Sequence, residues 1–439
     1  MRAVLMRLYG AATWMLQPLL RRKLRRRAVA EPGYAVAVEE RFGHYEESKA
    51  GHGWVWIHAV SLGEARAAAI LIEVLRRQQP GIRLLLTNGT ATGREEGAKL
   101  LGPNDLQVWQ PWDTPAAVER FLDRFRPRVG VLMETEIWPV LTAACAERGI
   151  PLALANARLN EKSLASAKRL AWIARPTYAS LAAVWAQTEA DAHRLVSAGA
   201  KVDGVFGNLK FDATPDSLQL ARAATFREKL PKPVIVFASS RDGEEQMFLD
   251  VLKRFRNAPP VGYSPTAGKK VRMPVQDVQW MIVPRHPQRF DEVAALVEAS
   301  GFIVARRSAA AAATDDAEIW LGDSLGEMAL YYGLADAALL GGSFEALGGQ
   351  NLIEAAACGC PVIMGPSTFN FAEAAELSVA AGAALRTEDM EQAVVAALSL
   401  AADPVRHEGM VQAALAFSSS NRGAAARTAA AVLALLARR

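Results

Sequence analysis

The chain alternates short apolar runs with stretches of helical character, and it does so in two successive series. The first series has apolar runs at residues 54–60, 82–87, 106–109, 128–133, 150–155, 183–187 and 203–206. The second follows Pro231, with apolar runs at residues 233–239, 280–283, 302–305, 318–321, 335–340 and 361–364. Apolar runs of this length, each followed by a helix, are typical of a parallel sheet covered on both faces. Two such series predict an α/β protein with two doubly wound, Rossmann-like domains.

The length of 439 residues allows two domains of ordinary size. A polar segment at residues 212–217, which contains a proline, separates the two series, so we place the domain boundary there. We expect an N-terminal segment over 1–30, a first domain over 31–212 and a second domain over 213–439. Because ligands of doubly wound sheets bind at the carboxyl ends of the strands, we expect the domains to face each other across a cleft that holds the site.

Three segments of the chain lack a strand pattern. Residues 256–278 show no sustained period and residues 308–316 are rich in alanine and aspartate, so we expect both to be surface loops. Residues 424–439 are rich in alanine and leucine and end in two arginines. We expect them to form a helix that packs on the surface.

The stretch 338–364, ALLGGSFEALGGQNLIEAAACGCPVIM, predicts a strand, a glycine-rich turn, a helix and a second strand. Two glycine pairs, Gly341-Gly342 and Gly348-Gly349, permit tight turns and close approach to a ligand. The helix is expected to begin at Asn351, and a helix N-terminus behind glycines suits a phosphate. Glu354 lies one turn further on, where it could accept hydrogen bonds from ribose hydroxyls. The alternative is a turn needed only for packing, but two glycine pairs followed by Asn and Glu favour a nucleotide site.

Two commoner nucleotide signatures are absent from the sequence, and the cysteines are few. No G-x-G-x-x-G follows a strand, and Gly268-Lys269-Lys270 lacks the other residues of a P-loop. The three cysteines include a C-x-C at 358–360, with few histidines nearby. This usage supports neither a disulfide framework nor a zinc site, and it predicts that the body is a reduced, cytosolic protein.

The positive charge is concentrated near the N-terminus. The formal net charge is +4, and residues 21–27, RRKLRRR, carry six positive charges, which leaves a net charge of −2 on the rest. The body of the chain is therefore not expected to bind nucleic acid. Residues 3–20 are mostly apolar, and a basic run behind them suits an anionic lipid surface.

Three interpretations of this N-terminus compete. A secretory signal carries its positive charge before the apolar stretch, and here the charge follows it. A basic solvated helix is the plainer alternative. We favour a membrane-associated segment, spanning or interfacial, with the chain beyond Arg27 on the cytoplasmic side.

Carboxylates follow two strands of the first series. Glu64 opens a helix behind Gly63, where the helix N-terminus would hold it ionised and ready to accept a proton from a hydroxyl. For Glu64 alone, a helix-stabilising role is the better explanation, and Gly63 shifts the balance slightly toward a ligand. Glu134 and Glu136 end the strand at 128–133, a position less easily explained as solvated helix surface.

Basic side chains follow other strands. Arg158 and Lys162 stand in NARLNEKS and Lys210 stands in GNLKFD, so fixed cations would suit an anionic substrate. In the second series, three segments could touch a nucleotide, although each is equally consistent with a solvated loop: Ser239–Arg241, Pro284–Pro287, and Gly326-Glu327, which begins a helix after Gly322-Asp323. His286 could be a base, and a hydrogen-bonded structural histidine is the equal alternative.

Taken together, these motifs resemble one enzyme family. The order WIHAVSLGE, METEIWP, NARLNEKS, GNLKFD, SSRDGEE, VPRHPQRF, DSLGEM and GGSFEALGGQNLIEAAACGCPVIMGP is similar to that of the 3-deoxy-D-manno-octulosonic acid (Kdo) transferases. The resemblance runs from about Gly33 to the C-terminal region. Gln350 and Arg241 depart from it, because the family often has His at both places.

The resemblance implies a glycosyltransferase of the GT-B fold that takes CMP-Kdo as donor and a lipid A precursor as acceptor. It implies inversion at the anomeric carbon, no metal or other cofactor, and attachment to the cytoplasmic face of the inner membrane. Glu64 would be the general base, and Glu134 and Lys210 would assist the transition state. The implied CMP-binding residues are Pro284, Arg285, Leu325, Gly326, Glu327, Asn351, Leu352, Ile353 and Glu354.

Two rival functions stay open at this point. A sugar-nucleotide epimerase of the same fold would need no lipid and no N-terminal anchor. A membrane-surface protein without catalytic activity would leave the cleft motifs unexplained.

Overall fold

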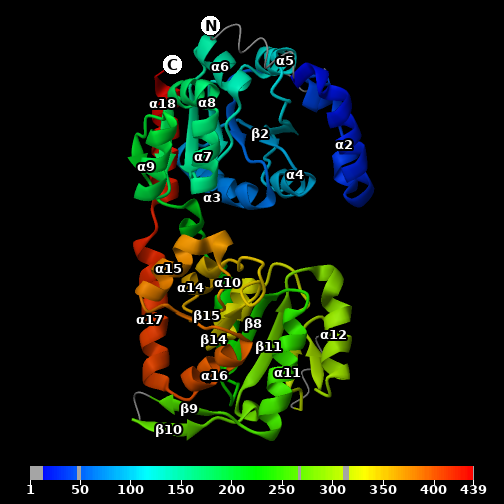
Figure 1. Cartoon of the computed structure of the whole chain (residues 1–439), viewed down its shortest axis with the longest axis vertical. Helices are drawn as coiled ribbons and strands as arrows, with labels where there is room; N and C mark the ends of the chain where they lie inside the picture. The colour runs from blue at the N-terminus through cyan, green and yellow to red at the C-terminus, as the bar shows by residue number, and fades with distance from the viewer. Residues whose placement is uncertain (1–12, 47–50, 265–267, 310–315, 439) are drawn as a thin grey trace. The chain divides into compact units, whose positions relative to one another are not determined.

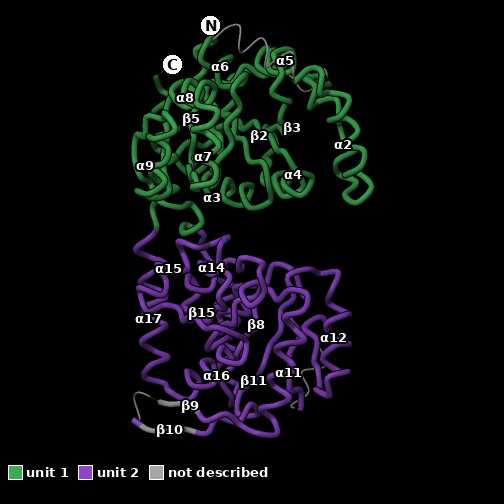
Figure 2. The backbone as a smooth tube through the Cα atoms, viewed as in Figure 1, with its two compact units in different colours: residues 1–212, 422–439 green, residues 213–421 purple. Residues whose placement is uncertain are grey.

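The computed structural model describes residues 13–46, 51–264, 268–309 and 316–438. The chain forms two compact units, one of residues 1–212 and 422–439 and the other of residues 213–421 (Figures 1 and 2). Each unit is built on its own seven-stranded parallel sheet. The prediction of two doubly wound α/β units is therefore confirmed.

The first unit has the strand order β3-β2-β1-β4-β5-β6-β7. Its strands are β1 (Val55–His58), β2 (Leu84–Asn88), β3 (Leu106–Trp109), β4 (Val129–Met133), β5 (Leu152–Ala157), β6 (Ala183–Ala186) and β7 (Gly204–Val205). Its helices are α2 (Gln17–Ala30), α3 (Leu62–Gln78), α4 (Ala91–Ala98), α5 (Pro115–Phe125), α6 (Pro139–Glu147), α7 (Glu161–Arg169), α8 (Ala171–Ala179), α9 (Glu189–Ala198) and α18 (Ala424–Ala437). Short 3₁₀ turns occur at η1 (Pro32–Ala35), η2 (Val38–Phe42) and η3 (Leu209–Asp212).

The second unit has the strand order β12-β13-β11-β8-β14-β15-β16. Its strands are β8 (Val234–Ser240), β11 (Gln279–Pro284), β12 (Val304–Arg306), β13 (Ile319–Leu321), β14 (Ala337–Leu340), β15 (Val362–Met364) and β16 (Ala384–Arg386). Its helices are α10 (Ser217–Arg227), α11 (Glu244–Asn257), α12 (Phe290–Ala299), α13 (Met328–Leu334), α14 (Leu352–Ala357), α15 (Ala372–Ala380), α16 (Met390–Ala401) and α17 (Pro404–Ser420). Its 3₁₀ turns are η4 (Val275–Asp277), η5 (Pro287–Arg289) and η6 (Phe369–Phe371).

The strands of the first unit bury side chains on both faces of the sheet. On β1, Val55 and Ile57 enter one apolar cluster with α3, whereas Trp56 enters the other with α5. Successive strand residues point to opposite faces, so a continuous apolar run fills both layers of the core. Because these strands are continuous apolar runs, the sequence predicts them.

Polar residues mark the starts of many helices. Each accepts a hydrogen bond from a backbone N–H of the first turn, which satisfies a donor that the helix leaves unpaired. The N-cap residues that do so are Ser61, Thr90, Thr114, Asn160, Thr188, Asp216, Asn351, Asp389 and Asp403.

The C-terminal helix belongs to the first unit, which corrects the expected second domain over 213–439. Helix α18 packs on α3, and Val432 and Ala429 are fully buried in the same apolar cluster as the strands. Its start is held by Asp212, whose carboxylate accepts hydrogen bonds from the backbone N–H groups of Gly423 (2.6 Å) and Ala425 (2.8 Å). The helix therefore completes the core of the first sheet and is more than a surface helix.

The two segments predicted to be loops of the second unit are only partly irregular or only partly described. Part of the predicted loop 256–278 forms an antiparallel ribbon of β9 (Val261–Ser264) and β10 (Lys269–Arg272), which pair with each other. The sequences of β9 and β10, VGYS and KKVR, are not apolar runs, so the signal that marked the sheet strands is missing from them. In the predicted loop 308–316, residues 310–315 lie outside the described residues.

The N-terminal helix α2 is tied to the body through the turns that follow it. Leu24 is buried, and the guanidinium of Arg21 lies 3.8 Å from the ring centre of Phe42 and pairs with Glu39. Of the apolar stretch 3–20, residues 3–12 lie outside the described part of the chain. Within the part that is described, no helix has both the length and the apolar character that a bilayer crossing requires.

Removal of the Asp212 carboxylate should loosen α18 and destabilise the first unit. We expect Asp212→Ala to lower the unfolding free energy of that unit by about 1–2 kcal/mol, because two helix N-terminal N–H groups lose their acceptor. Denaturant unfolding followed by tryptophan fluorescence measures this, since eight of the ten tryptophans lie in the first unit. The control Glu298→Ala removes an exposed carboxylate of the second unit and should leave the curve unchanged.

Candidate functional site

Each sheet reverses its strand order at one point, and the functional side chains collect at these points. In the first unit the chain moves outward from β1 to β2 and β3, then returns to β4 on the other side of β1. In the second unit the corresponding reversal lies between β8 and β14. Loops diverge at such a switch point and leave room at the carboxyl ends of the strands, which is where ligands of doubly wound sheets bind.

Glu64 lies at the switch point of the first unit, in the first turn of α3. Its carboxylate accepts hydrogen bonds from the backbone N–H of Val60 (2.8 Å) and from the hydroxyl of Ser61 (3.0 Å). Ser61 in turn caps α3 by accepting from the backbone N–H of Glu64. The local sequence S-x-x-E is thus a capping arrangement, and it fixes the direction of the Glu64 side chain.

The environment of Glu64 makes it a stronger proton acceptor than an ordinary carboxylate. Burial raises the pKa of Glu64 to about 7, and the hydrogen bonds from Val60 and Ser61 only partly oppose this. The nearby carboxylates of Glu134 and Glu136 raise the pKa further. Desolvation therefore opposes the expected effect of the helix N-terminus, and a pKa of about 7 leaves Glu64 only partly ionised in neutral solution. A pKa near 7 is the value at which a carboxylate serves best as a general base in neutral solution.

Glu134 follows β4 and is the charged centre of a small cluster. The residue is 4% exposed and has a left-handed backbone with φ of 58°. Its carboxylate pairs with the guanidinium of Arg158, with 2.8 Å between Nε and Oε2, and with the ammonium of Lys210, with 3.9 Å between Nζ and Oε1. Two cations therefore stabilise the charge of Glu134, whereas the charge of Glu64 is opposed by burial and by like charges.

The other two polar candidates of the first unit differ in their surroundings. Glu136 is partly buried beside Glu134, and burial raises its pKa, as does the charge of Glu134. Lys162 is exposed on α7, and within the described part of the chain no ion pair joins it to the Glu134 cluster. The structure thus brings together Glu64, Glu134, Glu136, Arg158 and Lys210, and leaves Lys162 outside.

In the second unit, the glycine-rich turn is held by a buried carboxylate. Glu244, the first residue of α11, is fully buried and accepts hydrogen bonds from the backbone N–H groups of Gly342 (2.7 Å) and Phe344 (3.1 Å). A Cβ at Gly341 would lie 2.1 Å from the carbonyl oxygen of Ser239, so this glycine is required by the packing of β14 against β8. The first glycine pair is therefore accounted for by protein contacts, as the packing alternative expected.

The start of α14 follows the expected pattern. Asn351 caps the helix, its Oδ1 accepting a hydrogen bond from the backbone N–H of Ile353 at 3.2 Å. Leu352 and Ile353 are 0% and 1% exposed, so their side chains belong to the core. Glu354 is partly buried near Tyr332, whose pKa is raised chiefly by burial and further by the charge of Glu354. A ligand at this helix start would meet the backbone of Leu352 and Ile353 rather than their side chains.

Arg285 connects two segments predicted to lie at the site. Pro284 ends β11, and the backbone N–H of Arg285 donates to the carbonyl of Ser240 at the end of β8. The Arg285 side chain reaches Gln350, with 3.1 Å between Nε and Oε1. Burial lowers the pKa of His286, and the positive charges of Arg241, Arg285 and Arg289 lower it further. These cations therefore surround the carboxyl end of β11.

The segment Leu325–Glu327 lies before α13. Leu325 is 74% exposed, and the carbonyl of Gly326, which has a φ of 79°, accepts a hydrogen bond from Gln219 Nε2 at 2.8 Å. Glu327 pairs with Arg307 at 3.0 Å and accepts a hydrogen bond from the hydroxyl of Ser324. Helix α13 packs against α14, so this segment and Asn351 belong to neighbouring elements.

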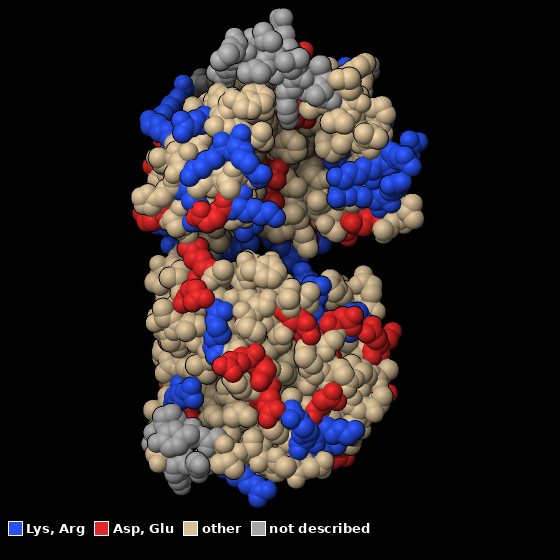
Figure 3. Space-filling model, viewed as in Figure 1, with Lys and Arg blue, Asp and Glu red and all other residues tan. Residues whose placement is uncertain are grey.

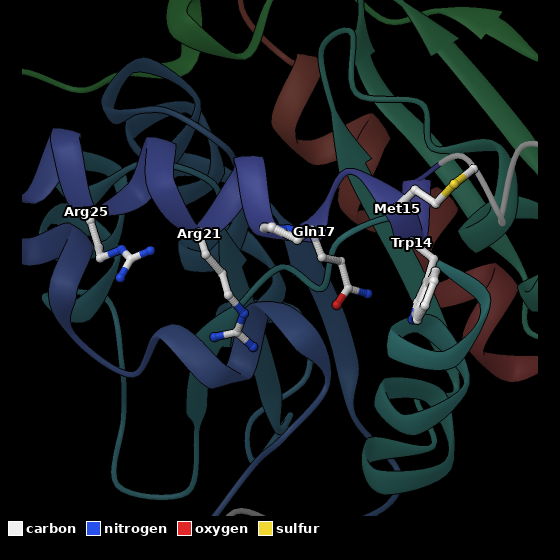
Figure 4. Close-up of a pocket in the computed structure, with 6 residues that line it drawn as sticks. Trp14, Met15, Gln17, Arg21 and Arg25 are labelled. Carbon is white, nitrogen blue, oxygen red and sulfur yellow. The ribbon is translucent and has the colours of Figure 1, made fainter.

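Helix α2 carries a separate candidate surface. Lys and Arg side chains gather over this helix in Figure 3, and its exposed basic residues are Arg22, Lys23, Arg25, Arg26 and Arg27. Arg21 and Arg25 point from one side of the helix, with Trp14 and Met15 further along, as Figure 4 shows. The cavity there has a volume of about 470 Å³ and is lined by Trp14, Met15, Gln17, Pro18, Arg21 and Arg25.

Sequence reasoning missed two residues that organise these sites. Glu244 stood in the motif SSRDGEE without an assigned role, and nothing local showed that its carboxylate would be buried against the glycine turn. Asn156 stood in NARLNEKS, and its left-handed backbone with φ of 51° could be suggested only by the tolerance of asparagine for that conformation.

Comparison with known proteins identifies relatives that match most of the chain. Residues 37–213 match the family model described as 3-deoxy-D-manno-octulosonic-acid transferase (kdotransferase). A 3-deoxy-D-manno-octulosonic acid transferase of Bordetella pertussis is 46% identical over 85% of this chain and 85% of its own length. One of Haemophilus influenzae is 30% identical over 83% of both chains.

Solved structures share the fold at low sequence identity. A UDP-GlcNAc 2-epimerase from Neisseria meningitidis, bound to UDP-GlcNAc, has a TM-score of 0.55 and 16% identity, covering 89% of this chain and all of its own. A glycosyltransferase from Rickettsia africae has a TM-score of 0.54 and 14% identity, covering 88% of this chain and 99% of its own. At these identities the likeness shows the fold alone, the two Rossmann-like units of the GT-B class.

The raised pKa of Glu64 should appear in the pH dependence of stability. The pKa is about 7 in the folded chain and 4.5 in the unfolded reference, so folding favours the protonated form. This contribution is fully present below the unfolded pKa and is lost as the pH rises through the folded pKa. We expect wild type to lose up to about 3 kcal/mol relative to Glu64→Gln between about pH 5 and about pH 8.

Urea unfolding followed by tryptophan fluorescence across this pH range measures the difference. The control Glu147→Gln changes an exposed carboxylate at the end of α6 and should track wild type. A constant difference between wild type and Glu64→Gln would contradict the raised pKa.

Proposed function

The chain belongs to the family of 3-deoxy-D-manno-octulosonic acid transferases and is a glycosyltransferase, and we propose that it transfers Kdo from CMP-Kdo to a lipid A precursor. The proposed reaction inverts the configuration at the anomeric carbon and uses no metal. The observation that supports it best is the pair of carboxylates at the switch point of the first unit. Glu64 has a pKa of about 7, whereas Glu134 is buried against two cations.

In the proposed mechanism, Glu64 is the general base. Its carboxylate takes the proton of a glucosamine hydroxyl on the acceptor as the hydroxyl oxygen attacks the anomeric carbon of Kdo. The new carbon–oxygen bond forms on the face opposite the leaving group, while the bond from the anomeric carbon to the phosphate oxygen of CMP breaks. The electron pair of that bond leaves with CMP, so the products are the glycosylated lipid, CMP and protonated Glu64. General-base assistance of this kind contributes about 10²–10⁴ to a rate.

The cations around Glu134 suit an anionic donor. CMP-Kdo carries negative charge on its sugar carboxylate and on its phosphate, and fixed cations stabilise charge that develops on a leaving group. Lys210 is held near Glu134, and a side chain already in place costs no reorganisation during the reaction. We assign to Glu134 and Lys210 the stabilisation of the transition state, with Arg158 as the second partner of Glu134.

We assign the binding of CMP to the second unit. Arg285 is a cation at the end of β11, and Asn351 and Glu354 stand in the first turn of α14. Because Gly342 and Phe344 donate their N–H groups to Glu244, the phosphate would rely on Arg285 and on the start of α14. The remaining proposed contacts come from Pro284, Leu325, Gly326 and Glu327, and from the backbone of Leu352 and Ile353.

We further propose that α2 holds the enzyme at the cytoplasmic face of the inner membrane, where the acceptor lipid is embedded. Trp14 and Met15 are 65% and 66% exposed, and Arg22, Lys23, Arg25 and Arg26 are exposed beside them. Aromatic side chains favour the headgroup region, and basic side chains are attracted to anionic lipid.

A sugar-nucleotide epimerase is the second candidate, because one shares the fold. That likeness concerns the fold alone, whereas the relatives at 46% and 30% identity are Kdo transferases. Incubation of the purified protein with CMP-Kdo and lipid A precursor separates the two. Transfer predicts CMP release that requires the lipid and a lipid product heavier by one or more Kdo residues; turnover of a sugar nucleotide without lipid would favour the epimerase.

Loss of the Glu64 carboxylate should remove catalysis and spare donor binding. We expect Glu64→Gln to lower kcat by about 10²–10⁴ while the affinity for CMP stays unchanged. In wild type, kcat/KM should rise with pH to a plateau above about pH 7, because the ionised carboxylate is the active form. CMP release and calorimetric binding of CMP measure the two effects, with Glu147→Gln as control. Full turnover by Glu64→Gln would refute the assignment of the base.

The basic face of α2 should govern attachment to anionic membranes. Replacing Arg22, Arg25 and Arg26 with Gln should weaken binding to vesicles that contain anionic phospholipid by about 100-fold, at about 1 kcal/mol for each charge. Co-sedimentation with vesicles measures this, and neutral vesicles should show no difference. The control variant replaces three exposed basic residues of the second unit, Arg222, Lys229 and Lys253, with Gln. Equal loss in the two triple variants would point to net charge and not to α2.

A further inference from the structure

Lys210 sits on a short turn, η3, and the structure shows what holds that turn in place. We propose that Asn156 is a positioning residue that keeps Lys210 within reach of Glu134. This inference rests on the proposed function, because it assigns Asn156 to the same reaction. The test below therefore includes a measurement that does not depend on transfer activity.

Asn156 has an unusual backbone at the carboxyl end of β5. Its φ is 51°, and the pairing of β5 with β6 shifts register between Leu154 and Ala157. The residue is 2% exposed. A left-handed residue at the end of a strand interrupts the hydrogen-bond ladder, and its side chain no longer follows the alternation of the strand. Asparagine accepts this conformation more readily than most residues. Glu134, which is also left-handed, donates its backbone N–H to the carbonyl of Ala155, the residue before Asn156, at 3.0 Å.

The side chain of Asn156 is directed at the segment that carries Lys210. Its Oδ1 accepts a hydrogen bond from the backbone N–H of Leu209 at 3.0 Å, in a buried position. The backbone carbonyl of Asn156 accepts a second bond from Gln187 Nε2 at 2.9 Å, which fixes the peptide from the other side. Its Nδ2 has no hydrogen-bond partner among the described residues. Asn156 thus joins the ends of β5 and β6 to η3.

The η3 turn has its second attachment on the opposite side of Lys210. Asp212 holds the start of α18, and the side chains of Leu209 and Phe211 are buried. Lys210 lies between these two attachments, with its own N–H donated to Asn208 Oδ1 at 3.0 Å. Loss of the Asn156 acceptor would leave the Leu209 N–H buried without this partner, so the turn would shift to find another.

A small shift of η3 would be enough to disturb the proposed catalytic contact. The Lys210 ammonium lies 3.9 Å from Glu134 Oε1, at the outer limit of an ion pair. Positioning therefore acts on kcat more than on donor affinity, because the contact supports the transition state in the proposed reaction.

The test compares two substitutions at position 156 that both tolerate a positive φ. Asn156→Gly removes the Oδ1 acceptor and keeps the backbone, whereas Asn156→Asp keeps an acceptor for Leu209. We expect Asn156→Gly to lower kcat by about 10–100-fold, with the KM for CMP-Kdo changed little, because removal of one transition-state donor costs about 10²–10³. We expect Asn156→Asp to stay close to wild type.

A double-mutant cycle shows whether the loss is transmitted through Lys210. The variant Asn156→Gly/Lys210→Ala should be no slower than Lys210→Ala alone, because the two changes remove the same contact. Arg126→Gly is the control, since Arg126 is an exposed, left-handed residue at the end of α5 with φ of 42°. Multiplying losses in the double variant, or equal losses in Asn156→Gly and Asn156→Asp, would overturn the proposal.

Chemical labelling of Lys210 provides the readout that is independent of transfer. Limited acetylation with acetic anhydride, followed by mass spectrometry of the peptide that contains Lys210, measures the accessibility of its amine. We expect Asn156→Gly to raise the labelling rate of Lys210 severalfold, while Asn156→Asp and Arg126→Gly leave it unchanged. If wild type transfers no Kdo, the proposed function fails, and an unchanged labelling rate in Asn156→Gly refutes the positioning role separately.

Discussion

The first unit is organised around two carboxylates buried at the switch point of a parallel sheet. Burial disfavours a charged carboxylate unless hydrogen bonds or opposite charges compensate for the lost solvent. The two carboxylates differ in the partners that surround them. Glu134 has Arg158 and Lys210 as partners, whereas Glu64 has the Val60 N–H and the Ser61 hydroxyl, and its pKa is raised to about 7.

This difference suits the two roles proposed for these similar side chains. Glu134 pairs with two cations, whereas the desolvated Glu64 has a pKa of about 7, which suits the proposed proton transfer. The ends of strands β4 and β5 also carry unusual backbone conformations. Glu134 and Asn156 both adopt left-handed backbones, which are disfavoured for residues other than glycine and persist where the surrounding structure holds them.

In the second unit, a buried carboxylate stabilises the glycine-rich turn that follows β14. Parallel strands β8 and β14 lie so close at their carboxyl ends that no side chain fits at Gly341. The N–H groups of Gly342 and Phe344 are then directed inward to Glu244. The turn is thus held by Glu244 and leads into Gln350, which contacts Arg285, and into the start of α14.

Much of this fold and part of the site were predictable from the sequence, because the features that signal them lie within a few residues of one another. Buried strands need continuous apolar runs and helix starts need capping side chains, so both leave marks within a few residues. The sheets, the helix start at Asn351 and the position of Glu64 behind β1 were therefore found. What the tertiary structure decided depends on partners distant in the chain: the attachment of α18 to the first unit, the raised pKa of Glu64, the burial of Glu244, and the link from Asn156 to Leu209 across 53 residues. Desolvation and long-range hydrogen bonds arise only when these segments meet, and no local pattern encodes them.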